Sequence, residues 1–285
     1  MKYSSTLKIL IPLIGLLALF AAGMGLFYQL PGEPYPFTSH RGETVMINAR
    51  GLYYYDTVSS AAQQQGNDVV TLFVALPLLV VSTWMTLRGS LRGRLLLTGT
   101  IGFFLYTYLS MCMLTAFNAL FLVYVAIFGM SLYAFILCMM SFDLKTLPRH
   151  FSDRLPRGWI AALLFFIGVF LMLTWLGRVL TPLIQDTSPL LDNGITMVIQ
   201  AMDLSLIIPL AVLSGILLLR RSAWGYLLTS VFVLKAIALG LAVSAMVVNM
   251  TLAGTPESAG IAIPFIVITV LNLLAVVSLW KNFQE

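Results

Sequence analysis

Residues 223–249 read AWGYLLTSVFVLKAIALGLAVSAMVVN and contain one charged side chain, that of Lys235. A helix rises about 1.5 Å per residue, so a run of this length crosses the hydrocarbon layer of a membrane, which is about 30 Å thick. The stretch therefore predicts a transmembrane helix. Seven other apolar runs are long enough to do the same. The eight predicted spans are residues 9–28, 69–87, 95–115, 118–141, 158–181, 196–219, 223–249 and 260–280.

The composition supports the same fold class. Of the 285 residues, 60% are hydrophobic and 9% are charged, whereas about 25% are charged in a soluble domain. So few charges cannot cover a surface that faces water, which excludes a soluble protein. We expect an all-α integral membrane protein in which residues 1–285 form a single polytopic domain. The net charge is +5, but no basic block is long enough to predict a nucleic-acid partner.

The lysines and arginines between the spans predict the orientation, because cytoplasmic loops carry an excess of them. Of the 16 Lys and Arg residues, Lys235 lies within a span and three (Arg41, Arg50 and Arg178) fall on one side. The other twelve fall on the opposite side: Lys2, Lys8, Arg88, Arg92, Arg94, Lys145, Arg149, Arg154, Arg157, Arg220, Arg221 and Lys281. We therefore expect cytoplasmic N and C termini, in a bacterial cytoplasmic (inner) membrane.

Residues 29–68 form the largest loop, which is expected outside. Its proline-rich start, LPGEPYPF (30–37), favours an extended chain. A short hairpin is predicted around NARG (48–51), followed by a polar helix with Asp56 as its N-cap. The three tyrosines at 53–55 are interpreted as an interfacial anchor, with a binding platform as the alternative.

Two stretches of the chain resemble each other when the sequence is shifted by 132 residues. LFVALPLLVVSTWMTLRGSLRGRLL (72–96) and LSLIIPLAVLSGILLLRRSAWGYLL (204–228) match at eleven of 25 positions, including Pro77/Pro209 and Arg88/Arg220. The match predicts a parallel repeat of four plus four spans. Parallel repeats occur in transporters, but a duplication without any transport role would leave the same pattern.

The sequence lacks the common motifs of enzyme active sites. It contains no GxSxG, HExxH, GxxxxGK[ST] or CxxC motif, and its two histidines, His40 and His150, are expected on opposite sides of the membrane. Cys112 and Cys138 are likewise expected near opposite faces, too far apart to form a disulfide. We therefore expect no enzymatic activity, no cofactor and no metal site.

Lys235 is the most unusual feature, because a charged lysine at the centre of a membrane helix costs about 2.5–3.5 kcal/mol. Counting the helical rise places Tyr106 and Asn272 at a similar depth and Asp203 roughly 8 Å nearer the outside. The small residues Ala236, Gly240 and Ser244 would let a second helix approach this span. The predicted substrate or ion path comprises Lys235, Asp203, Tyr106, Asn272, Gln200 and Tyr133.

Two interpretations of Lys235 and Asp203 stay open: a polar site of a small-solute or ion carrier, or a structural pair with a lysine that extends toward water. The first predicts a carrier whose partners are the lipid bilayer and a small solute or ion. The alternative is a non-catalytic sensor, or an accessory subunit that binds another membrane protein. A retinal photoreceptor is disfavoured, because its lysine lies in the last of seven helices whereas an eighth span follows here.

Overall fold

The computed structural model describes residues 4–187, 189, 191–255 and 259–284. It is 74% helical, and eight helices are long and apolar enough to cross a membrane, which confirms a multi-pass helical fold of eight predicted spans. Lys2, used above for the orientation, lies outside the described residues. The helices are α1 (Ser4–Phe27), α2 (Val58–Val70), α3 (Leu76–Leu87), α4 (Leu91–Leu114), α5 (Phe121–Met140), α6 (Arg157–Gln185), α7 (Val198–Met202), α8 (Ile208–Leu219), α9 (Ala223–Leu252) and α10 (Ala259–Lys281).

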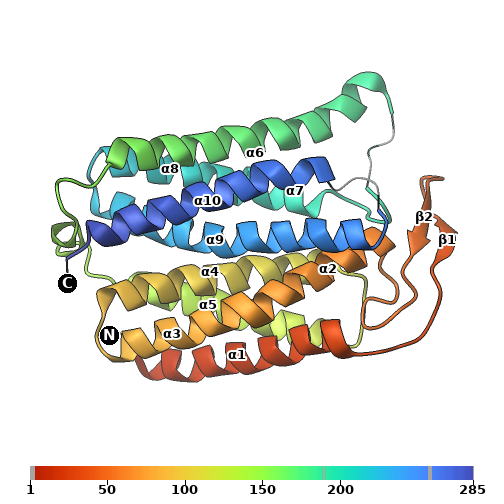
Figure 1. Cartoon of the computed structure of the whole chain (residues 1–285), viewed down its shortest axis with the longest axis horizontal. Coiled ribbons are helices and arrows are strands. Elements are labelled where there is room, and N and C mark those ends of the chain that lie inside the picture. Colours follow the sequence, from red (N-terminus) through yellow and green to blue (C-terminus); the bar gives the residue numbers. More distant parts are fainter. Residues whose placement is uncertain (1–3, 188, 190, 256–258, 285) are drawn as a thin grey trace.

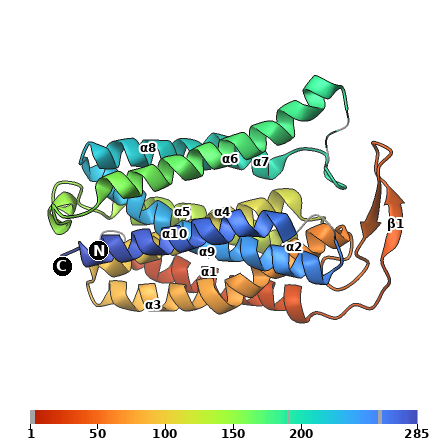
Figure 2. The same ribbon diagram turned by 45° about the horizontal axis from the view of Figure 1, so that its top comes forward.

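The spans lie side by side along the long axis of the molecule, and the marked N and C ends of the chain lie at the same end of the bundle (Figures 1 and 2). Helix α4 is the most buried span, with 72% of its apolar window inside the protein. It packs against α3, α5 and α9, whereas α9 also packs against α2, α8 and α10. Helices α4 and α9 therefore form the centre of the packing among the spans.

Two of the spans are interrupted by a wide π-helical turn. The turn η1 (Thr71–Ala75) joins α2 to α3, and η3 (Asp203–Ile207) joins α7 to α8. Each precedes a proline, Pro77 or Pro209, whose ring disfavours a normal α-helical turn and which has no N–H to donate. The peptide N–H of the residue just before each proline reaches back five residues, to the carbonyl that opens the turn. Such π turns are frequent at functional sites.

The starts of α4 and α9 are built alike. The side chains of Ser90 and Ser222 each accept a hydrogen bond from the backbone N–H three residues later, as helix N-caps do. Those N–H groups belong to Gly93 and Gly225, where a Cβ would collide with the preceding helix. The π turns, the prolines and these caps are all offset by 132 residues, the register in which the sequence repeat was predicted.

The segment of residues 29–68, predicted to lie outside, differs from its prediction in two places. The hairpin pairs β1 (Tyr35–Thr38) with β2 (Thr44–Ile47), so its turn lies at residues 39–43 rather than at NARG. Gly42, with φ of +83°, allows that turn. In NARG, the Asn48 side chain instead bonds backbone carbonyls of the same loop. The N-cap of α2 is Thr57 rather than Asp56, and its hydroxyl accepts from the N–H of Ser60.

Asp56 anchors the loop between α1 and α2 to the rest of the protein. Only 4% of it is exposed, and its Oδ1 accepts from the Ser60 hydroxyl at 3.0 Å and from the Ala116 N–H at 3.1 Å. Burial raises the pKa of this carboxyl from 3.8 to about 6, and the nearby Asp192 adds to the rise. The hydrogen bonds lower the pKa and offset part of the effect.

We expect Asp56 to make the protein less stable as the pH rises from about 4 to about 6. The folded state binds this proton more tightly than the unfolded chain, so the free energy of unfolding falls across that interval and levels off above it. The shift corresponds to a loss of about 3 kcal/mol. Asp56→Asn should remove this pH dependence, measured as thermal unfolding between pH 4 and 8. Equal pH dependence in Asp56→Asn and the wild type would contradict the assignment, and Glu43→Gln serves as the control.

Candidate functional site

Asp203 is held inside the bundle by two hydrogen bonds from other helices. It is the first residue of η3, and 6% of it is exposed. Its Oδ1 accepts from the Tyr106 hydroxyl of α4 at 2.7 Å, and its Oδ2 accepts from the indole N–H of Trp175 on α6 at 2.8 Å. Both carboxylate oxygens therefore have a donor, and the group is fixed between α4 and α6.

Lys235 of α9 lies on the other side of the same tyrosine. Its Nζ is 4.1 Å from the centroid of the Tyr106 ring, and 9% of the residue is exposed. Within the described residues this ammonium forms no ion pair within 4.0 Å and no hydrogen bond. Tyr106 thus links the two charges: its ring faces the ammonium and its hydroxyl binds the carboxylate.

Glycines on α4 make room for the lysine. A Cβ at Gly99 would lie 2.6 Å from the Leu234 Cβ and 3.3 Å from the backbone nitrogen of Lys235. A Cβ at Gly102 would lie 3.9 Å from the Lys235 Cγ. The stripe predicted at Ala236, Gly240 and Ser244 lies elsewhere on α9. A Cβ at Gly240 would collide with Thr269 of α10. The helix that closes over Lys235 is therefore α4, and its glycines allow the approach.

The electrostatics of this cluster favour a bound ligand. A lysine over an aromatic face gains about 2 kcal/mol when both are removed from water. That gain does not replace the three hydrogen bonds that an ammonium can donate. The attraction of Asp203 acts across the tyrosine rather than through a direct contact. An oxygen atom of a small solute could accept a hydrogen bond from Lys235 Nζ and so supply the acceptor that this ammonium lacks among the described residues.

The other predicted path residues do not all join this cluster. Gln200, one turn before Asp203, lines an external hollow. Asn272 of α10 is fully buried, but its Nδ2 donates to the Ile268 carbonyl, and its Oδ1 has no hydrogen-bond partner among the described residues. Tyr133 is 65% exposed on the outer face of α5, so the prediction that it lies on an internal path is corrected.

Trp175 is the residue that the sequence prediction missed. It stands in LMLTWLGR (171–178), where nothing distinguishes a tryptophan that faces the interior from one that anchors a helix in the interface. Leu171, four residues earlier, is the last buried residue of the inward face of α6. Continuing that face by one turn leads to Trp175. This spacing of four residues is the one signal that could have identified the tryptophan as inward-facing.

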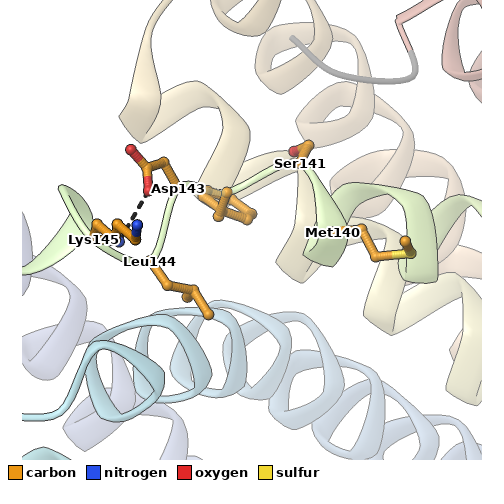
Figure 3. A pocket seen from close by; sticks show the side chains of 6 residues that line it. Met140, Ser141, Asp143, Leu144 and Lys145 are labelled. Atoms are coloured by element: carbon orange, nitrogen blue, oxygen red, sulfur yellow. Dashed lines mark hydrogen bonds between the residues drawn. The ribbon is translucent and has the colours of Figure 1, made fainter.

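Two hollows open on the surface. Figure 3 shows the first, of about 450 Å³, at the turn after α5; it is lined by Met140, Ser141, Phe142, Asp143, Leu144 and Lys145. The dashed line there is the bond from the Lys145 N–H to the Asp143 carboxylate. The second hollow, of about 470 Å³, is lined by residues that include Arg41, Thr196, Gln200 and Leu204. Gln200 and Leu204 flank Asp203 in the chain, but Asp203 itself does not line this hollow.

No family model, curated protein or solved structure matches the chain, so the candidate site stands on its geometry alone.

Proposed function

We propose that this protein is a carrier of a small solute or ion, and that Lys235, Tyr106 and Asp203 form its binding site. The observation that carries the proposal is the lysine: a buried ammonium, shielded by α4, that lacks a hydrogen-bond acceptor among the described residues. Ionisable groups inside a membrane are costly, and they commonly mark substrate or ion pathways. A purely structural lysine would be expected to have its donors satisfied.

The surroundings of the cluster support the same proposal. Asp203 is the first residue of the π turn η3, so the regular α-helical hydrogen bonding is interrupted at the residue that carries the carboxylate. We infer that a solute enters by the hollow lined by Gln200 and Leu204, which flank Asp203 in the chain. A solute entering there would meet Asp203 before Lys235. A polar group on the solute could then replace the attraction that now acts across Tyr106.

The proposed carrier has cytoplasmic N and C termini in a bacterial cytoplasmic membrane, and two related halves. The excess of Lys and Arg at one end supports the orientation. The shared 132-residue offset of the π turns and helix caps supports the repeat. In such an arrangement the Tyr106–Asp203 bond joins α4 of the first half to η3 of the second. Sites between repeated halves are typical of transporters.

An accessory subunit is the second candidate, supported by the external hairpin. Tyr35 and Phe37 of β1 and Met46 of β2 are each more than 40% exposed. Exposed aromatic and methionine side chains are enriched where proteins meet. A membrane protein partner that covers this hairpin would give the chain a role without transport. Substitution of these three residues by serine would then release the partner and leave solute binding unchanged.

A thermal-shift experiment tests the carrier proposal. The purified protein is heated with a panel of small carboxylates, amino acids, phosphate and sodium or potassium chloride. A bound solute stabilises the folded protein, so at least one should raise Tm in the wild type. Lys235→Met should lose that rise, whereas Lys145→Met, in the hollow of Figure 3, should retain it. A rise of equal size in Lys235→Met would contradict the assigned site.

A further inference from the structure

A second buried carboxyl lies in the first half of the bundle, on α2. Asp68 is 1% exposed, and its Oδ2 accepts from the Tyr53 hydroxyl at 2.6 Å. A Cβ at Gly25 of α1 would collide with this carboxylate and lie 2.8 Å from the Tyr53 hydroxyl, so α1 packs directly on the pair. In the described part of the chain, no lysine, arginine or histidine forms an ion pair with Asp68.

Polar groups without partners surround this carboxyl. Tyr108 of α4 and Tyr124 of α5 are 0% and 2% exposed, with ring centroids 6.1 Å apart, and both interact electrostatically with Asp68. Their hydroxyls form no hydrogen bond of good geometry within the described residues, and neither do Asn67 Oδ1 and Thr71 Oγ1. Asn67 on α2 and Thr71, the first residue of η1, are about one turn apart and flank Asp68 in the chain.

An ionised carboxylate in these surroundings needs a positive charge. Burying a carboxylate without a cation costs several kcal/mol, and one tyrosine hydroxyl offsets only part of that cost. Among the described residues, no charged side chain of α1 or α9 contacts this part of α2: α1 supplies Gly25, and α9 packs on α2 through Met246 and Asn249. The titratable groups that face Asp68 are Tyr53, Tyr108 and Tyr124. The positive charge must therefore come from a ligand.

The size of the site favours the smallest cation. The carboxylate already touches the backbone of α1 at Gly25, and a metal ion would need several more oxygen ligands around it. A proton needs only one lone pair.

We propose that Asp68 is a proton-binding site inside the bundle, where a proton balances the charge of its buried carboxylate. On loading, the proton forms an O–H bond at one Asp68 oxygen, and on release it returns to water. Neither step involves another reactant. The site lies apart from the Lys235 cluster, so it stands whether or not that cluster binds a solute.

Infrared difference spectroscopy of the wild-type protein in vesicles, titrated with acid and base, tests the assignment. A protonated carboxylic acid has a carbonyl band that an ionised one lacks. We expect such a band to appear on acidification and to be absent from Asp68→Asn. Asp143→Asn, at an exposed turn, should leave the band unchanged. Tyr53→Phe should move it to higher frequency, because the group loses its hydrogen bond; this variant keeps the carboxyl, so it remains informative if Asp68→Asn does not fold.

Three results would overturn the proposal. A band of Asp68 that persists at every pH would show a permanently neutral group that exchanges no proton. No such band at any pH would show a permanently ionised group. A band that disappears on adding sodium chloride at constant pH would identify a metal cation as the ligand instead of a proton.

Discussion

Lys235→Met and Asp203→Asn should each destabilise the protein strongly as single variants and much less when combined. Removing one partner of a buried charge pair leaves the other uncompensated, which costs about 3–5 kcal/mol. Both charges are buried here and share Tyr106 as their neighbour. In the double variant no uncompensated charge remains, so the losses of the single variants should not add. Thermal or denaturant unfolding of the four proteins measures the coupling.

The rescue should be partial, for a reason visible in the site. Asp203 accepts from both Tyr106 and Trp175, whereas the amide nitrogen of an asparagine cannot accept. One donor therefore loses its acceptor in every variant that carries Asp203→Asn. Adding Trp175→Phe to these variants should recover about 1 kcal/mol of the free energy of unfolding, because the unpaired indole N–H is removed. Strictly additive effects of Lys235→Met and Asp203→Asn would show that the two charges do not interact.

Gly66→Val should destabilise the protein by about 3 kcal/mol or prevent its folding. Gly66 lies on α2 where this helix packs against α9, and a Cβ there would lie 2.6 Å from both the Cα and the N of Met246. These are backbone atoms, so no side-chain rotation relieves the contact. Gly129→Val on α5 is the matched control, because nothing lies within 4 Å of a Cβ at that position. Equal yields and melting temperatures of the two variants would contradict the packing of α2 on α9.

The number of helices could be predicted from the sequence because it depends mainly on the length of the apolar runs. Every apolar run had to be long enough to cross the membrane, and each appears as a helix long enough to do so. The second span begins earlier than predicted, at Val58 instead of residue 69. Its first turns carry polar residues such as Gln64 and Asn67, which are buried against protein and escape a hydropathy criterion.

Depth could be predicted for the candidate site, but direction around the helix axis could not. The helical rise placed Tyr106 and Lys235 near each other, and the structure brings them into contact. Tyr133 was included in the predicted path, yet it faces outward from α5. The buried face of α5 runs through Tyr124, Ser131 and Cys138, at intervals of seven residues. That stripe excludes Tyr133 and includes Tyr124, which the predicted path did not contain.

Contacts between distant segments account for most of what sequence reasoning missed. Trp175 and Asp203 meet only because α6 packs on η3. Tyr53 reaches Asp68 only because the loop between α1 and α2 folds back into the bundle. Both hydrogen bonds satisfy buried groups whose partners lie 15 or more residues away, and a single sequence carries no signal for such pairs.

The most direct test of the central claim is the reactivity of a cysteine at position 235. The background carries Asp203→Asn, so that no orphan carboxylate remains, and lacks the native Cys112 and Cys138. If the cluster is a solute site, Lys235→Cys should react in intact vesicles with 2-aminoethyl methanethiosulfonate, which restores a positive charge. The reaction should be slower than at Gln63→Cys, the external reference, and faster than at Tyr133→Cys on the outer surface of α5. No reaction at position 235 while Gln63→Cys reacts fully from outside would show that Lys235 is sealed within the bundle, and the carrier proposal would fail.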